Sequence, residues 1–299
     1  MVATTKLAPV AWTAAHRPWN VLPAMAPLNS IGRVVLAGSI VAACLLAHAA
    51  SAAPAGVPTA PTCRELERRL DLIKPEAKST ELNLVLFAAA DSGCLPLARR
   101  LLDAGASLAA RDRLGAMALA RAARAGHVAL VDFLVARGAP LDARNLAGAT
   151  ALYAAVENER QASVAMLLTR RADPNLAGPS GVTPLAAAAF KGSGRILDQL
   201  IAAGADPDVL DTTGKAAMTY AAGRGFALIV GRLLEAGVDP RRAYGNDLTA
   251  LMIAAELGHG EIVDRLLRRG ADRSIADNSG KRARDLAAND SIREKLGAR

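Results

Sequence analysis

Small apolar, large apolar and glycine positions recur at a constant interval along this chain. In most copies an alanine-rich stretch comes before one glycine, and a leucine-rich stretch comes before a second. The second glycine precedes alanine or, once, valine, and it stands at Gly105, Gly138, Gly204, Gly237 and Gly270. A period between about 20 and 50 residues is typical of a solenoid, whose units bury their apolar faces against one another.

Each copy has the pattern of two short helices joined by a glycine turn. Thr150, Thr183 and Thr249 stand where an N-cap hydroxyl would accept hydrogen bonds from free helix amides. Pro184 follows at the first helical position, where its missing N–H costs nothing. Paired small residues on the first helix and paired leucines on the second supply two apolar faces. A turn and a hairpin then lead to the next copy.

Some copies depart from this pattern. Met117 and Ala216 replace the capping threonine, and the third copy has Glu159 and Arg171 at its two glycine stops. These stops are expected to be left-handed helix ends. An L-residue with a side chain adopts that conformation at a cost of about 1 kcal/mol or more. We therefore predict that the third copy is the least protected from hydrogen exchange.

The stretches GVTPLAAAAFKGS, GATALYAAV and DLTALMIAAELGHGEIVDRLLRRGAD together resemble the ankyrin-repeat family. The resemblance covers roughly residues 79–289. It implies an all-α repeat solenoid, an ankyrin array of about six 33-residue helix–turn–helix repeats with β-hairpin fingers. A C-terminal half-repeat, GKRARDLAAND, ends the array, and residues 290–299 form a C-terminal cap or tail. The repeats begin near Ser79, Asp112, Asn145, Gly178, Asp211 and Tyr244.

The segment 1–52 has the features of a secretory signal peptide. Arg33 precedes an apolar run from Val34 to Ala47, and a small-residue cleavage site follows near residues 50–52. Met25 gives a more ordinary signal length than Met1. A lipobox reading, in which Cys44 becomes the lipidated first residue, and an uncleaved anchor remain alternatives. Residues 53–61 form a flexible Pro/Ala linker.

A capping helix is predicted over residues 62–75. Thr62 and Glu65 have the spacing of a capping box, and apolar residues follow at helical intervals until Pro75. The helix would cover the first repeat, because a terminal repeat has one side without a neighbour.

Composition and charge narrow the function. Aromatic residues are only 3% of the chain, and both tryptophans precede the repeats. The net charge is +8, and Lys6, Arg17 and Arg33 are the only charged residues before residue 53, so a processed chain keeps +5 of it. This mildly basic surface is too weak an argument for nucleic-acid binding.

No set of residues indicates catalysis, a metal site or a cofactor. His127 and His259 occupy equivalent turn positions four repeats apart, where we expect structural hydrogen bonds. The glycine-rich fragments lack the spacing of a phosphate loop or a nucleophile elbow. Cys63 and Cys94 either form a disulfide that ties the capping helix to the array or remain buried thiols.

The candidate chemistry is therefore a binding surface. By resemblance, partners of ankyrin proteins lie on the inner helices and the finger tips. The corresponding inner-helix residues are Arg124, Phe190, Lys191 and Arg224, and the finger residues are Arg113, Leu114, Leu146, Lys215, Tyr244 and Asn246. Phe190 among basic residues resembles an interface anchor, although its ring would also fit folded back onto its neighbours.

These features favour a non-catalytic protein–protein interaction module or scaffold in the bacterial periplasm. It would bind an unidentified protein through its concave face and hairpin tips, without a small-molecule substrate or nucleic acid. Membrane attachment would come only through the signal segment or a lipid on Cys44. An enzyme, a nucleic-acid binder and a membrane-anchored lipoprotein with a structural envelope role are the alternatives.

Overall fold

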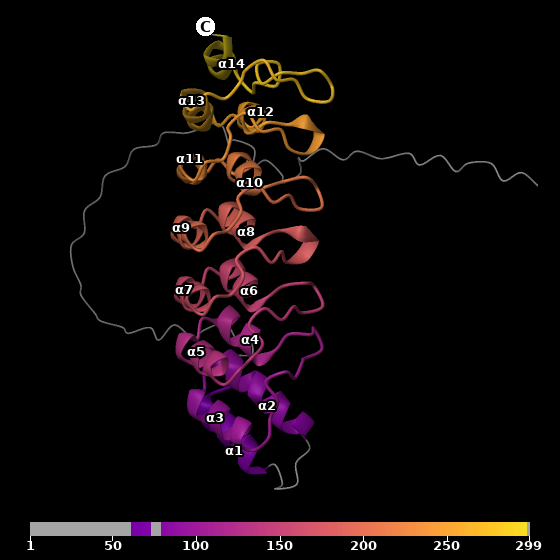
Figure 1. Ribbon diagram of the computed structural model, residues 1–299, viewed down its shortest axis with the longest axis vertical. Coiled ribbons are helices and arrows are strands. Elements are labelled where there is room, and N and C mark those ends of the chain that lie inside the picture. The colour runs from indigo at the N-terminus through magenta and orange to yellow at the C-terminus, as the bar shows by residue number, and fades with distance from the viewer. Residues whose placement is uncertain (1–60, 73–78, 298–299) are drawn as a thin grey trace, which may run out of the picture. The chain divides into compact units, whose positions relative to one another are not determined.

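The structure, a computed structural model, describes residues 61–72 and 79–297. The expected signal peptide over 1–52 with Met25 and Cys44, the linker up to residue 60, residues 73–75 of the capping helix and residues 298–299 lie outside the described residues. Six consecutive helix pairs stack in two columns, and the loops that join the pairs project on one side (Figure 1). The expected all-α repeat solenoid is confirmed.

The columns are named here by their place relative to the projecting loops. The inner column lies next to the loops and contains α2 (Ser79–Ser92), α4 (Ala118–Ala125), α6 (Ala151–Glu157), α8 (Pro184–Lys191), α10 (Ala217–Gly223) and α12 (Ala250–Glu256). The outer column contains α3 (Leu95–Asp103), α5 (Val128–Ala136), α7 (Gln161–Thr169), α9 (Gly194–Ala202), α11 (Ala227–Glu235) and α13 (Gly260–Arg268). Helix α1 (Cys63–Leu72) contacts α2 and α3, and α14 (Asp290–Gly297) contacts α13.

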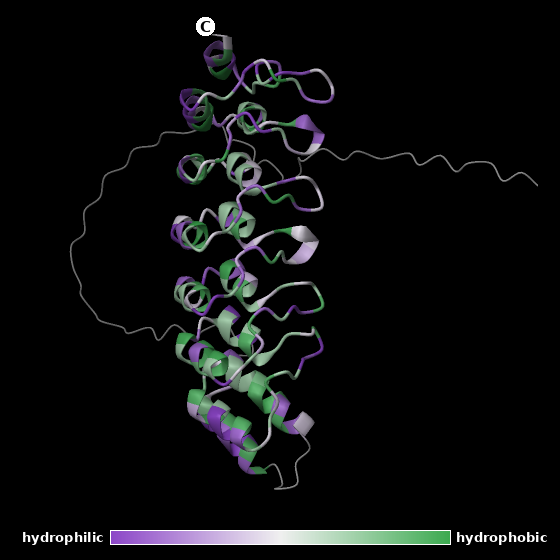
Figure 2. Ribbon diagram, in the orientation of Figure 1, coloured by the Kyte–Doolittle hydropathy of each residue, from purple (hydrophilic) through white to green (hydrophobic). Residues whose placement is uncertain are grey.

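The core runs the length of the array and follows the repeated apolar positions. The inner helices contribute alanines that are 0% exposed, namely Ala89, Ala122, Ala155, Ala188, Ala221 and Ala254. The outer helices contribute leucines that are 0% exposed, namely Leu101, Leu134, Leu167, Leu200, Leu233 and Leu266. Small side chains let neighbouring inner helices approach closely, and each buried leucine contributes about 2 kcal/mol of transfer free energy. Figure 2 shows the hydrophobic residues along both columns, with more polar and intermediate residues in the loops.

The predicted helix starts are confirmed. The Thr150, Thr183 and Thr249 hydroxyls each accept a hydrogen bond from the amide three residues later, at 3.2–3.3 Å. Met117 makes no such bond. At Ala216 the bond is reversed, because the Thr219 hydroxyl accepts from the Ala216 amide at 3.0 Å.

In the first, second, fourth and fifth repeats the glycine after the inner helix leaves room for a side chain from the next repeat. A Cβ atom on Gly93 would lie 2.5 Å from the His127 ring, and one on Gly192 would lie 2.9 Å from the Phe226 ring. The His127 ring also bonds to the Asp91 carbonyl at 2.8 Å. The structural role predicted for the histidines is therefore confirmed at this turn. The glycine is needed both for its positive φ and for the space above it.

The third repeat has side-chain residues, not glycine, at both helix ends. Glu159 has φ 55° and Arg171 has φ 68°, as expected for side-chain residues at left-handed stops. In the next repeat the residue equivalent to His127 and Phe226 is the small Ser193. Its hydroxyl donates a 2.5 Å hydrogen bond to the Glu159 carboxylate. A ring at this position would collide with the Glu159 side chain.

The projecting loops, called fingers here, differ from the expected β-hairpins. Within residues 61–72 and 79–297 there is no β-strand, and only two isolated bridges join Ala243 to Thr249 and Ala276 to Arg282. Each finger is closed by a backbone bond from one residue to the carbonyl four positions later. In four fingers the first residue also accepts, through its side-chain oxygen, from amides two and four positions later: Asp112, Asn145, Asp211 and Asp277. This is the turn chemistry for which Asp and Asn are favoured.

Two fingers lack Asp or Asn at this position and take another shape. Gly178 and Tyr244 begin them, and each contains a 3₁₀ turn, η1 (Pro179–Gly181) or η2 (Gly245–Asp247). Ser180 and Asn246 have positive φ there. A side chain on Gly178 would collide with the Tyr153 ring, because its Cβ would lie 2.7 Å from a ring carbon.

The junction between the third and fourth repeats, called the third joint here, has fewer polar ties than its neighbours. Adjacent fingers elsewhere share a backbone bond, such as Leu146 N–H to the Leu114 carbonyl at 2.9 Å. The equivalent donor at the third joint would be Pro179, which has no N–H. No ion pair joins repeats three and four in the described part, whereas every other pair of adjacent repeats has at least one. Side-chain hydrogen bonds still cross this joint: Ser193 bonds Glu159, and Asn175 bonds the Gly204 carbonyl and the Asp206 amide.

The third repeat also contains a polar residue in the core. Ser163 on α7 is 0% exposed, and its hydroxyl has no hydrogen-bond partner among the described residues. Every other repeat has leucine or isoleucine at the equivalent position. An unsatisfied buried hydroxyl costs about 1–3 kcal/mol, so we expect the outer helix of this repeat to be less stable than its neighbours.

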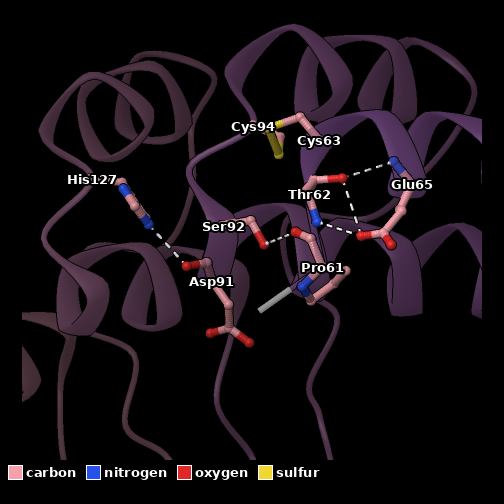
Figure 3. The surroundings of a disulfide bond; sticks show 8 residues. All are labelled: Pro61, Thr62, Cys63, Glu65, Asp91, Ser92, Cys94 and His127. Atoms are coloured by element: carbon pink, nitrogen blue, oxygen red, sulfur yellow. Dashed lines mark hydrogen bonds between the residues drawn. A yellow bond between two sulfur atoms is a disulfide. The ribbon is translucent and has the colours of Figure 1, made fainter. Parts of the chain in front are cut away.

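The N-terminal helix is tied to the first repeat by several bonds (Figure 3). The Thr62 amide donates to the Glu65 carboxylate at 2.8 Å, and the Glu65 amide donates to the Thr62 hydroxyl at 3.3 Å, so the predicted capping box is present. The Ser92 hydroxyl donates to the Pro61 carbonyl at 2.9 Å. Cys63 and Cys94 form a disulfide across a Cα–Cα distance of 5.5 Å. The structure thus shows the bonded alternative for the two cysteines.

Candidate functional site

An exposed aromatic and basic cluster lies on the inner column at repeats four and five. Phe190, in the last turn of α8, is 42% exposed. Tyr220 from α10 meets it edge to face, with ring centroids 5.8 Å apart. The Arg224 guanidinium lies 4.8 Å from the Phe190 centroid and 5.7 Å from that of Phe226. We call these four residues the aromatic cluster.

The Phe190 ring folds against its neighbours, as one of the two expectations states, and its role as an interface anchor stays a prediction. The ring packs against the next repeat, through Tyr220 and Arg224, and more than a third of the residue still faces solvent. Packing restricts the side chain to one orientation, so less entropy is lost when a partner covers it. The ring is therefore both supported and accessible.

Three cations at the cluster have no carboxylate partner in the described part of the protein. Arg224, Lys191 and Arg195 are exposed and form no ion pair with residues 61–72 or 79–297. Cation–π contact with the two rings holds Arg224 in place. Two carboxylates on the outer helices there are engaged elsewhere, Asp198 by Arg232 and Glu261 by Arg265.

Hydrogen bonds link the cluster to a finger. The Tyr220 hydroxyl donates to the Asp211 carboxylate, and the Lys215 ammonium lies 6.0 Å from the Tyr220 ring centroid. Burial, followed by this hydrogen bond, raises the pKa of Tyr220. Burial alone would raise the pKa of Asp211, but bonds from Tyr220, Lys215 N–H and Thr213 outweigh it and lower that pKa. Burial lowers the pKa of Lys215, and the Asp211 charge opposes this effect.

Protonation of the Asp211 carboxylate is expected to make the array less stable in acid. Because its folded pKa lies below the unfolded value, its stabilisation is complete above the unfolded pKa and disappears as pH falls through the folded pKa. Asp211→Asn keeps the finger amide bonds but loses the charged acceptor for Tyr220. We expect the variant to be about 1 kcal/mol less stable than wild type at pH 7, and the difference to vanish near pH 2.

Urea unfolding followed by circular dichroism at several pH values measures this difference. Glu256→Gln is the matched control, since Glu256 is exposed and makes no hydrogen bond with the described residues. A difference between wild type and Asp211→Asn that is the same at pH 7 and pH 2 would contradict the role of the charge.

The fingers hold only some of their predicted residues at the surface. Arg113, Leu114 and Asn246 are exposed, with Leu114 at 67% and Leu146 at 81%. Tyr244 does not project as predicted, because it is only 6% exposed. It stands at the base of its finger, where its amide bonds the Leu248 carbonyl and its side chain faces the core.

The predicted residues do not form one site. Arg124, Arg113 and Leu114 belong to the second repeat, whereas the aromatic cluster belongs to repeats four and five. Arg124 is also engaged in an ion pair with Asp91 at 3.3 Å. Tyr220 and Phe226 were not among the binding residues predicted from the sequence. Tyr220 stands one helical turn before the position equivalent to Phe190 in the next repeat, and this placement was the available signal.

A groove of about 470 Å³ adjoins the cluster between the first turns of α9 and α11. Its lining includes Phe226, Leu228, Ile229 and Arg195. Leu228 is 70% exposed, and Phe226 belongs to both the groove and the aromatic cluster. Groove and cluster therefore form a continuous surface strip.

Metal-binding groups and membrane spans are both missing from the described residues. These residues contain no group of three or more His, Cys, Asp or Glu side chains arranged to hold a metal ion. Every helix described between residues 61 and 297 is too short or too polar to span a bilayer.

A family model described as "Ankyrin repeats (3 copies)" matches residues 86–177 and 180–290, which is more than half of the chain. The chain belongs to the ankyrin-repeat family. Two similar solved structures are ankyrin repeat domains. That of Bcl-3, described as a unique member of the IkappaB protein family, is 25% identical with a TM-score of 0.67, covering 71% of this chain and 97% of that one.

The second structure is the human ASB11 ankyrin repeat domain, 27% identical with a TM-score of 0.62, covering 71% of this chain and 95% of that one. The comparison with curated proteins gives no match. Ankyrin repeats are generally protein–protein interaction modules, and the fold is generally a non-catalytic scaffold.

Proposed function

We propose that this ankyrin array is an exported scaffold that acts in the bacterial periplasm and binds a protein partner at the aromatic cluster. One observation carries the proposal: Phe190 is held in place by Tyr220 and Arg224 and is still 42% exposed. Aromatic residues and arginine dominate the binding energy of protein interfaces, particularly where neighbouring contacts exclude water. The exposed finger residue Asn246, in the repeat that follows the cluster, extends the surface available to the partner.

Export is supported by the sequence before the array. A basic residue, Arg33, is followed by the apolar run from Val34 to Ala47 and by a small-residue cleavage site. The Cys63–Cys94 disulfide is consistent with an oxidising compartment. Processing near residue 52 predicts a mature chain without residues 1–52, and intact mass spectrometry of the purified protein measures it. A lipidated Cys44 or an uncleaved chain would have a different mass and would contradict this form of export.

Affinity capture tests the binding role. The tagged mature protein is used to capture partners from its host's envelope fraction, alongside a Phe190→Ala, Arg224→Glu variant. Arg268→Glu is the matched control, because Arg268 is exposed on α13 and has no ion-pair partner among the described residues.

We expect one protein to be enriched by the wild type and the control and lost with the double variant. Equal enrichment by all three would leave a binding protein but move its site away from the aromatic cluster. Absence of any enriched protein would contradict the scaffold role.

A further inference from the structure

We propose that the partner presents an extended acidic segment to the strip formed by the aromatic cluster and the adjoining groove. In this arrangement carboxylates pair with Lys191, Arg195 and Arg224, and one apolar side chain enters the groove beside Phe226 and Leu228. The inference rests on the proposed function and adds the chemistry of the partner to it.

Charge complementarity carries the first part of the proposal. Several arginines on the outer column each have a carboxylate from the preceding repeat, as in Arg170 with Asp132 and Arg269 with Glu235. At the strip three cations depart from this pattern. Asp198, Asp211 and Glu261 are already bonded to Arg232, Tyr220 and Arg265, and Lys191, Arg195 and Arg224 have no carboxylate in the described part.

Among the three cations, Arg224 is best placed to bind a carboxylate from a partner. Its side chain forms no hydrogen bond with the described residues, and its guanidinium is held against the rings of Phe190 and Phe226. A guanidinium has five N–H donors arranged to bind a carboxylate through two parallel bonds. The rings position the guanidinium and leave this capacity unused.

The apolar part of the proposal comes from the groove. Phe226 and Leu228 bring apolar surface to it, and Leu228 is 70% exposed. Arg195 lines the same groove. A carboxylate and an apolar side chain can therefore reach the strip from one chain segment.

The expected spacing follows from backbone geometry. In an extended segment, side chains alternate between two faces, so residues i and i+2 point the same way. A segment bound along the strip would place an acidic residue two positions before or after its apolar anchor, with the intervening side chain facing solvent.

A phage-displayed library of random dodecapeptides tests this directly. The mature protein is the target, and selected sequences are then synthesised and measured by fluorescence anisotropy. We expect enrichment of Asp or Glu two positions from Leu, Met or Phe, and affinity that falls as salt rises. Arg195→Glu and Arg224→Glu should each weaken binding about tenfold or more.

Further variants separate binding from folding. Arg224→Gln removes the charge without adding a repulsive one and should give a smaller loss than Arg224→Glu. Leu228→Ser should weaken binding through the groove, and Arg268→Glu should leave it unchanged. Circular dichroism of each variant verifies that the array is folded.

Selected peptides of neutral or basic composition, or acidic peptides insensitive to Arg195→Glu and Arg224→Glu, would overturn the acidic-segment proposal. So would the absence of selected peptides. A partner captured from the envelope and lost with Phe190→Ala, Arg224→Glu would still support the scaffold in each case. If acidic peptides bind as expected but the capture experiment enriches no protein, the chemistry of the strip is supported and the proposed envelope partner is not.

Discussion

Amide hydrogen exchange is expected to be faster in the third repeat, over α6 and α7, than in repeats two, four and five. Glu159 and Arg171 hold positive φ, and the Ser163 hydroxyl is buried without a partner among the described residues. The third joint adds to this weakness because Pro179 cannot donate the bond that other fingers share. In a repeat array each unit is stabilised mainly by its own contacts and those with its neighbours. Local losses therefore lower the free energy of local opening.

A Ser163→Ala, Arg171→Gly variant should reverse the effect. Alanine removes the unsatisfied hydroxyl, worth about 1–3 kcal/mol, and glycine removes about 1 kcal/mol or more of backbone cost. Together they should raise the opening free energy of α7 by about 2–4 kcal/mol and slow its exchange about 30-fold or more. Hydrogen-exchange mass spectrometry of peptides from each repeat measures both quantities.

Ser291→Ala serves as the control, since Ser291 is exposed on α14 and outside the repeats concerned. Uniform protection across repeats two to five in the wild type would show that neighbouring repeats clamp the third and that the sequence departures have no local cost. An unchanged α7 in the double variant would have the same meaning.

Loss of the disulfide should release the N-terminal helix. The bond joins Cys63 and Cys94 across a sequence separation of 31. The chain-entropy treatment gives about 3–4 kcal/mol for a loop of this length. Helix α1 depends on this tie, because Leu66 is its one fully buried residue. Exchange of α1 amides should accelerate by about several hundredfold when the bond is removed.

Cys63→Ala is the clean variant, because Cys63 is exposed and its replacement leaves the buried Cys94 side chain in place. Wild type treated with a reducing phosphine should behave like the variant, and phosphine should not alter the variant further. Equal exchange of α1 in oxidised wild type and Cys63→Ala would show that the capping box and the Ser92–Pro61 hydrogen bond suffice to hold the helix.

The amino-acid sequence alone determined the helix pairs, their caps and the histidine role. These features depend on chemistry between near neighbours, such as the Thr183 hydroxyl and the Ala186 amide, and the constant repeat interval copies that chemistry along the chain. The finger turns were also within reach, because Asp112, Asn145, Asp211 and Asp277 share one position. Their side chains bond amides only two and four positions away.

Contacts between repeats were decided by the tertiary structure. Periodicity places Phe190 and Arg224 in neighbouring repeats, but only the packing of α8 against α10 shows that the guanidinium lies over the ring. Tyr244 was expected at the surface and is buried, because the first residue of a finger stands at the finger base, next to the core. Likewise, the missing N–H of Pro179 has a consequence only because the adjacent finger carries the backbone carbonyl that would accept its hydrogen bond. Local sequence specifies each unit, whereas the direction of a side chain into the next unit depends on how the units stack.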